Sequence, residues 1–284
     1  MASSCLLFFR RTAMFLLFQL RCLKHHVRRY ALPAGEKNGD TLYIMGNGPS
    51  LKTDLPEIIE ACRQPGNRAL AVNFCAATEE FFQVRPAVYC LLDGLFFTHS
   101  HSEEKVRAMY DLMNKKVDWD MELVLPSSFA KQIRDFVKID NPHVKITFVN
   151  TLTYTGPESL AHRYYRKGYA MPAAQNIVIM AIMVGLNRGY SKIRLYGVDH
   201  TFLDGIGVDD DNHVVFRDTH FYGSQQRVLV DKDGNPYHLS LYLSMLSKTF
   251  DSHLKLMDYA KELGVDILNC TKGSMIDAYP RRKD

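Results

Sequence analysis

The stretch that decides the fold is LYIMGNGPSL, residues 42–51. A short apolar run ends at Gly46, Gly48 follows two residues later, and a region of helical pattern opens after Ser50. A buried strand that turns through two glycines into a helix brings backbone N–H groups and the positive end of the helix dipole close to an anionic ligand. The side-chain amide of Asn47 is placed to bond a phosphate or a sugar, and Ser50 is a candidate helix N-cap.

This motif differs from the two best-known phosphate-binding loops. The third glycine of the dinucleotide-binding fingerprint would fall at Leu51, and the Gly-Lys-Ser/Thr ending of a P-loop is absent. A plain strand-to-helix turn is therefore an alternative to a phosphate-binding loop.

Outward from this motif, short β-rich runs alternate with helical stretches. The predicted strands lie at 41–45, 69–73, 87–92, 122–125, 145–149, 192–196 and 265–269. The predicted helices lie at 51–61, 76–82, 101–114, 127–137, 176–186 and about 238–263. Strands separated by such helices form βαβ units. We therefore expect one α/β domain over residues 36–284, with a Rossmann-like, mostly parallel sheet and helices on both faces.

One region, residues 200–237, breaks the alternation. It is rich in Asp, Gly and His, has little helical pattern, and begins directly after a predicted strand. Long segments of this kind are usually functional, and open α/β sheets bind ligands at the carboxyl ends of their strands. We expect a lid over a site. Within it, the run Asp209–Asp211 is typical of a hairpin turn, and a divalent-cation site is the alternative.

The charge of the chain is unevenly distributed. With 46% hydrophobic and 23% charged residues among 284, the composition is globular and excludes intrinsic disorder. The net charge of +4 conceals six cations and no acid in residues 1–35, which leaves −2 for the remainder. A slightly acidic body disfavours nucleic acid as a partner.

The first 35 residues are also strongly apolar. Arg10 and Arg11 interrupt the apolar runs, so neither run has the roughly 20 residues that a membrane-spanning helix needs. The interruption is also atypical of a signal peptide. We expect residues 1–35 to form an amphipathic segment at a membrane surface, which makes the protein peripheral on the cytoplasmic side. An organellar presequence and a wrongly assigned start are the alternatives.

The six cysteines have the spacing of neither a zinc site nor a disulfide framework, because no C-x-x-C occurs. A reducing, cytosolic compartment is the simplest inference. We expect no bound metal and no resident cofactor, and the oligomeric state is not indicated by the sequence.

Five blocks of the chain carry a family resemblance. They are GNGPSLK at 46–52, AVNF at 71–74, LDGLFF at 92–97, QN at 175–176 leading to GYSKIRLYGVD at 189–199, and THFYG at 219–223. In this order they resemble the bacterial sialyltransferases of glycosyltransferase family 42. They are also similar to a wider group that includes 6-hydroxymethyldihydropterin diphosphokinase-like proteins and flagellin-modifying glycosyltransferases. The likeness covers roughly residues 41–279 and is specific at the first and fourth blocks.

The resemblance implies inverting, metal-independent transfer of a sugar, typically from CMP-sialic acid, to a hydroxyl of a glycan or lipid-linked acceptor. It assigns the general base to His220, and the ordinary histidine pKa suits this task near neutrality. His200, at the end of a predicted strand, is a second candidate. The resemblance implies that the nucleotide-sugar donor is bound by Gly46, Asn47, Gly48, Ser50, Asn73, Asp93, Gln175, Asn176, Asp199 and Tyr222.

Three positions depart from the family pattern. Asp93 stands where the family has Asn, residues 200–202 replace the tyrosines that grip the leaving phosphate, and residues 171–174 leave the family's Arg without a counterpart. Two other functions fit the same residues. One is Mg²⁺-dependent, diphosphokinase-like phosphoryl transfer, with Asp93, Asp199 or residues 209–211 near the metal. The other is a noncatalytic, membrane-tethered nucleotide-binding module.

Overall fold

The central sheet confirms the predicted Rossmann-like architecture. The computed structural model describes residues 2–25, 27–29, 41–220, 223–230 and 234–283. Seven parallel strands pair in the order β10-β6-β1-β2-β3-β4-β5. Their bounds are β1 Thr41–Met45, β2 Asn67–Val72, β3 Val88–Cys90, β4 Met121–Pro126, β5 Val144–Val149, β6 Lys192–Tyr196 and β10 Asp266–Asn269. The order reverses at β1, the position at which open α/β sheets form a ligand crevice.

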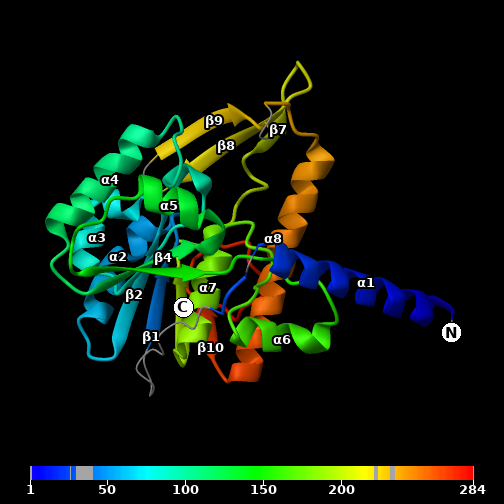
Figure 1. The fold of residues 1–284 in the computed structure, drawn as a ribbon. Helices are drawn as coiled ribbons and strands as arrows, with labels where there is room; N and C mark the ends of the chain where they lie inside the picture. Colours follow the sequence, from blue (N-terminus) through cyan, green and yellow to red (C-terminus); the bar gives the residue numbers. More distant parts are fainter. Residues whose placement is uncertain (1, 26, 30–40, 221–222, 231–233, 284) are drawn as a thin grey trace.

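Helices cover both faces of this sheet (Figure 1). One face packs against α2 Leu51–Cys62, α3 Glu79–Val84, α4 Glu103–Lys116 and α5 Ala130–Phe136. The other face packs against α6 Glu158–Arg166, α7 Ile177–Arg188 and α8 Leu239–Leu263. Short 3₁₀ turns complete the connections at η1 Asn73–Ala77, η2 Gly94–Phe96 and η3 Ser127–Phe129.

Helix α7 is the centre of the larger core. Its sequence IVIMAIMVGL is buried throughout, because the helix lies between the sheet and α8. The side chain of Asn176 caps its start by accepting hydrogen bonds from the N–H groups of Val178 and Ile179. Gly189, in the left-handed conformation with φ of 85°, ends it. Both ends of the predicted helix are thus close to those observed.

The predicted elements differ from the structure in detail. The helix predicted at 76–82 is divided into η1 and α3, and the one predicted at 127–137 into η3 and α5. Helix α6 was not predicted, because only its residues Ala161 and Tyr165 are buried and the apolar pattern is correspondingly weak.

Residues 206–228 form a second, three-stranded antiparallel sheet. Its strands are β7 Ile206–Val208, β8 Val214–His220 and β9 Gly223–Val228. This small sheet stands apart from the main sheet, near the beginning of α8 (Figure 1). A cluster of three buried side chains, Phe216, Tyr242 and Leu246, joins it to α8.

Helix α1, Ala2–Lys24, lies against the body on one side only. Phe18 is fully buried between the rings of Tyr154 and Tyr164, and Gln19 Nε2 donates a 2.8 Å hydrogen bond to the Tyr164 hydroxyl. The rest of the helix projects away from the sheet (Figure 1). Among the described residues, no helix has the length and apolar character needed to cross a membrane.

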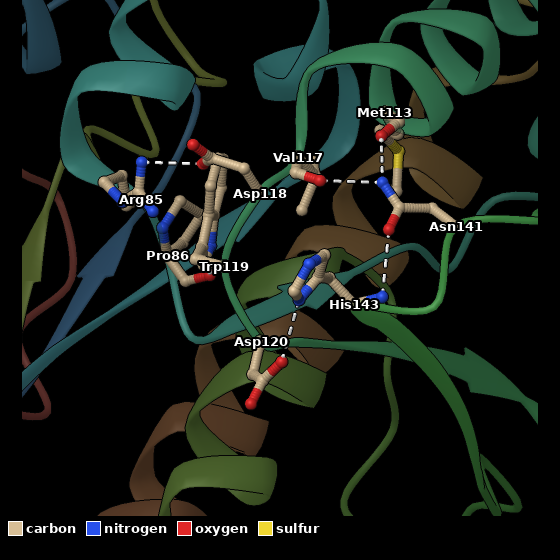
Figure 2. A network of polar contacts seen from close by, with 9 residues as sticks. All are labelled: Arg85, Pro86, Met113, Val117, Asp118, Trp119, Asp120, Asn141 and His143. Atoms are coloured by element: carbon tan, nitrogen blue, oxygen red, sulfur yellow. Dashed lines mark hydrogen bonds and ion pairs between the residues drawn. The ribbon is translucent and has the colours of Figure 1, made fainter.

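A polar network orders the loops at the amino-terminal edge of β4 and β5, opposite the site described below (Figure 2). Asn141 Nδ2 donates to the carbonyls of Met113 and Val117, at 3.1 and 2.7 Å, and Asn141 Oδ1 accepts from the His143 N–H. Trp119 Nε1 donates to the Pro86 carbonyl at 2.9 Å. These bonds satisfy loop backbone groups, so we assign the network a structural role.

Candidate functional site

A cavity of about 590 Å³ opens at the carboxyl ends of β1, β2, β3 and β6. The start of α7 and the small sheet form its other sides. The lining residues that the sequence predicted as ligand-binding are Asn47, Gly48, Asn73, Asp93, Gln175, Asn176 and Asp199. The topology therefore brings together seven predicted positions that extend from Asn47 to Asp199 in the chain.

The glycines of the first motif are explained by the approach of β1 to β6. The Gly46 N–H donates to the Tyr196 carbonyl and the Gly48 N–H to the Gly197 carbonyl, both at 2.8 Å. A Cβ at Gly46 would lie 2.2 Å from the Gly197 carbonyl oxygen, and one at Gly48 would lie 1.9 Å from Asp199 Oδ2. Both positions thus exclude side chains for reasons internal to the protein. Of the two, only Gly48 lines the cavity.

Ser50 has a different role from the one predicted. Helix α2 begins directly after it, as expected, but its side chain does not cap the helix. Instead, Ser50 Oγ donates a 2.7 Å hydrogen bond to Asp199 Oδ2, and the Ser50 N–H donates to Asp199 Oδ1 at 3.3 Å. The carboxylate of Asp199 thus lies at the helix N-terminus, where we had expected a phosphate. Ser50 and Gly46 are not among the cavity-lining residues.

The ends of β2 and β3 contribute Asn73 and Asp93. Asn73 has a φ of 53°, a left-handed conformation that Asn tolerates, and its carbonyl accepts a hydrogen bond from the Tyr89 hydroxyl. Asp93 caps η2 through a 3.0 Å hydrogen bond from the Leu95 N–H to its Oδ1. Both residues line the cavity, and the Asp93 side chain is held in place by its bond to the Leu95 N–H.

His200 is the most deeply buried polar group that lines the cavity. Its φ of 53° turns the chain at the end of β6, and its side chain is 7% exposed. His200 Nε2 lies 2.9 Å from Asn176 Nδ2 and 3.1 Å from Nε2 of the fully buried His253. Burial lowers the pKa of His200 to about 3 and that of His253 well below its usual value. Both rings are therefore neutral at physiological pH.

The charges that line the cavity are mostly negative. Among its described lining residues, Asp93, Asp199 and Asp204 are acidic and Arg227, on β9, is the one permanently charged cation. The sequence analysis did not single out Asp204 or Arg227. The only available signal was their position inside the predicted lid.

Two predicted residues remain untested. His220 ends β8 and pairs with Gly223 through the backbone, but its side chain lies outside the described part of the structure. Tyr222 lies outside the described residues altogether. The role of His220 as general base therefore stays a prediction, and so does the contact of Tyr222 with the donor.

Residues 209–213 form the hairpin turn that the sequence predicted between β7 and β8. Asp209 Oδ1 accepts hydrogen bonds from the N–H groups of Asp211 and His213, and Asn212 has a φ of 60°. Ligand atoms of Asp209, Asp211 and His213 lie within 4.8 Å of one another. No other observation in the described residues points to a cation here, and these residues do not line the cavity.

Comparisons with known proteins support the fold. No protein-family model and no curated protein matches the chain. Among solved structures, the chain is similar to the MAf glycosyltransferase from Magnetospirillum magneticum AMB-1, with a TM-score of 0.51 and 15% sequence identity. The similarity covers 95% of this chain but only 38% of that one. At this identity the likeness establishes a shared α/β fold and does not by itself establish an activity.

Proposed function

We propose that the chain is a glycosyltransferase that binds a nucleotide-activated sugar in the cavity and transfers the sugar to a glycan or lipid-linked acceptor. The observation that carries the proposal is the position of the cavity. It lies at the reversal point of a parallel sheet whose fold is similar to that of a glycosyltransferase, and seven of the residues predicted to bind the donor line it.

The charge of the lining favours a donor with a single phosphate. Carboxylates such as Asp93 and Asp199 accept hydrogen bonds from ribose or sugar hydroxyls, whereas they repel each phosphate charge. A CMP-linked sugar carries one phosphate charge fewer than a donor linked to a nucleoside diphosphate. Arg227 would meet the phosphate, and a sialic-acid-like sugar would direct its own carboxylate away from Asp93 and Asp199.

In the proposed reaction His220 removes the proton of the acceptor hydroxyl. The hydroxyl oxygen attacks the anomeric carbon, the bond from this carbon to the phosphate oxygen breaks, and the nucleotide leaves with inversion at the sugar. A small sheet held over the cavity would exclude water that otherwise hydrolyses the donor.

A thermal-shift panel tests the donor class. We expect CMP to raise the unfolding temperature more than UDP, GDP or ATP, because a ligand that binds only the folded state stabilises it. Turnover of a CMP-sugar should persist in EDTA. If EDTA abolishes turnover, the Mg²⁺-dependent phosphoryl-transfer alternative is favoured. Tight binding with no turnover of any donor favours the noncatalytic module.

A second experiment tests the general base. We expect His220→Ala to lower transfer by about 100-fold or more, because a positioned base contributes at least this factor. Nucleotide binding by the variant should be unchanged in the thermal-shift assay. Full activity of His220→Ala would show that another group takes the proton.

We also propose that α1 attaches the protein peripherally to the cytoplasmic side of a membrane. Its inner side docks through Phe18, while six large apolar side chains among its described residues are exposed, Leu17 by 59%: Phe9, Met14, Leu16, Leu17, Leu20 and Leu23. Six cations and no acid within residues 1–35 complement an anionic surface.

Vesicle sedimentation tests this attachment. The triple variant Leu16→Ser, Leu17→Ser, Leu20→Ser should bind anionic phosphatidylserine vesicles at least 100-fold more weakly, because each leucine contributes roughly 1 kcal/mol or more when buried in lipid. Leu254→Ser, which alters a comparably exposed leucine on α8, is the matched control. Equal vesicle binding by both variants would exclude the exposed side of α1 as the membrane contact.

A further inference from the structure

The hydrogen bonds around His200 determine which ring nitrogens carry a proton in a buried series of hydrogen-bonded side chains. Oδ1 of Asn176 accepts from two backbone N–H groups at the start of α7, so the atom that faces His200 is the amide nitrogen, which can only donate. His200 Nε2 must therefore be the acceptor and carries no proton.

The same reasoning extends to His253 and Tyr279. The contact between the two Nε2 atoms, at 3.1 Å, needs one proton, and since His200 Nε2 has none, His253 Nε2 supplies it. In the neutral His253 ring, Nδ1 is then an acceptor, and the Tyr279 hydroxyl, 3.1 Å away, donates to it. His253 is fully buried and Tyr279 is 3% exposed, so no solvent competes for these bonds.

With the protons arranged in this way, Nδ1–H is the one polar group of the His200 side chain that remains for a ligand in the cavity. A neutral imidazole whose Nε2 is unprotonated carries its proton on Nδ1. Among the described residues, no group accepts a hydrogen bond from this Nδ1–H. His200 lines the cavity beside Asp199 and Thr201.

We propose that His200 binds the donor in the cavity as an uncharged hydrogen-bond donor, through Nδ1–H to an oxygen of the nucleotide sugar. Asn176, His253 and Tyr279 are positioning residues that hold this tautomer. The proposal rests on the proposed function for the identity of the ligand. It also separates the two histidine candidates, because a ring whose one remaining nitrogen already bears a proton cannot serve as the general base, which leaves that role to His220.

Nuclear magnetic resonance of the full chain labelled with ¹⁵N-histidine tests the proton order directly. Long-range ¹H–¹⁵N correlations distinguish protonated from bare ring nitrogens. In the free protein we expect His200 protonated at Nδ1 and His253 at Nε2, with neither ring titrating between pH 6 and 8. A His200 ring protonated at Nε2, or one that titrates in this range, would overturn the inference.

Addition of CMP, UDP, GDP and ATP, each at saturation, tests the contact with ligand. For a nucleotide that binds, the His200 Nδ1–H resonance should shift and its exchange with water should slow. Binding that leaves this resonance unchanged would overturn the proposed contact. If none of the four binds, the proposed function fails, and the tautomers of the free protein then decide the inference alone.

Matched variants separate positioning from folding. Asn176→Asp keeps the oxygen that caps α7 but places a second acceptor against His200 Nε2, so the ring should gain a proton there. Asn176→Ser keeps an uncharged cap without the amide donor, and CMP affinity should fall about tenfold, as expected for one misdirected hydrogen bond. His253→Gln, which can both donate and accept, should preserve CMP affinity better than His253→Leu. Equal affinity of these last two variants would contradict the positioning role of His253.

Tyr259→Phe is a control for general loosening of α8. Tyr259 lies on α8 like His253 and is fully buried, but its hydroxyl donates to Asn187 Oδ1 at 2.8 Å, away from the chain of His200. This variant should leave both tautomers and CMP affinity unchanged. A change of tautomer in Tyr259→Phe would show that general loosening of α8, and not the specific hydrogen bonds, controls the proton order.

Discussion

The two sides of the cavity are built on different physical principles. The strand-end wall comprises residues 46–50 and 197–200 with Asn176, of which Gly46 and Ser50 lie behind the lining. It is held by hydrogen bonds between backbone, carboxylate and buried histidine rings. The small sheet β7–β9 contacts α8 through the apolar cluster around Phe216, and Val208 and Val228 are exposed on it. Directional bonds fix a ligand's position precisely, whereas a small apolar contact allows a cover to shift without unfolding the body.

The largest expected difference between the two sides is their response to acid. His200 and His253 of the wall have lowered pKa values in the folded protein because of burial. Below pH 6.5 both histidines take up a proton in the unfolded chain but not in the folded chain. The free energy of unfolding therefore has its full value above this pH and decreases as the pH falls. Urea unfolding should lose about 4 kcal/mol between pH 7 and pH 5 from these two groups.

His253→Gln serves as the internal comparison for this pH dependence. It removes one of the two titrating groups, so the acid-induced loss in the variant should be about half as large. If the free energy of unfolding of the unmodified chain did not change between pH 7 and pH 5, the histidines would be protonated in the folded state. The strand-end wall and the small sheet would then not differ in their response to acid.

The next largest effect is expected from a single methyl group in the wall. In Gly46→Ala the new Cβ would lie 2.2 Å from a backbone oxygen that cannot move aside without separating β1 from β6. We expect a loss of about 3 kcal/mol in the free energy of unfolding by urea. In Gly207→Ala, on β7 of the small sheet, the nearest atom is Val215 Cγ2 at 3.5 Å, so the change should be within about 0.5 kcal/mol. Equal losses in both would contradict the difference in tolerance.

The smallest of these effects tests the cover. Leu246→Ala removes one of the three buried side chains that join the small sheet to α8, and the loss should be about 2 kcal/mol and local. Hydrogen exchange should therefore accelerate at Val214–Phe216 while β1 and β6 keep their protection. Uniform acceleration across both sheets would show that the small sheet and the main sheet unfold as one unit.

Much of the fold follows from local pattern. Strands β1 and β6 have the predicted bounds, because apolar runs that end in glycine define both ends of a buried strand. Helix α6 was missed, since its packing depends on contacts distant in sequence, such as Tyr164 with Phe18 of α1. The extent of β8 and β9 was also missed, although the two strands pair with each other as a local hairpin. The ring of Tyr164 packs edge-to-face against Phe15 and Phe18 of α1.

The candidate site was predictable in its location and less so in its contacts. The resemblance to the family indicated Asn73, Asp93 and Asp199, and the first motif indicated Asn47. All four lie at or just beyond the carboxyl end of a strand, and the carboxyl ends of parallel strands share one edge. Arg227 carried no pattern of its own. The bond from Ser50 to Asp199, across 149 residues, had no signal in the sequence, and it brings a carboxylate to the start of α2.

The sequence by itself determined the parallel sheet, the ends of its strands and the concentration of charge in residues 1–35, because these depend on local periodicity and composition. Only the tertiary structure decided that His200 meets His253 and that Asp199 closes the start of α2. Each of these contacts joins two elements, and the sequence pattern of neither element predicts the contact. They arise because a buried polar group must find a partner wherever the packed chain supplies one.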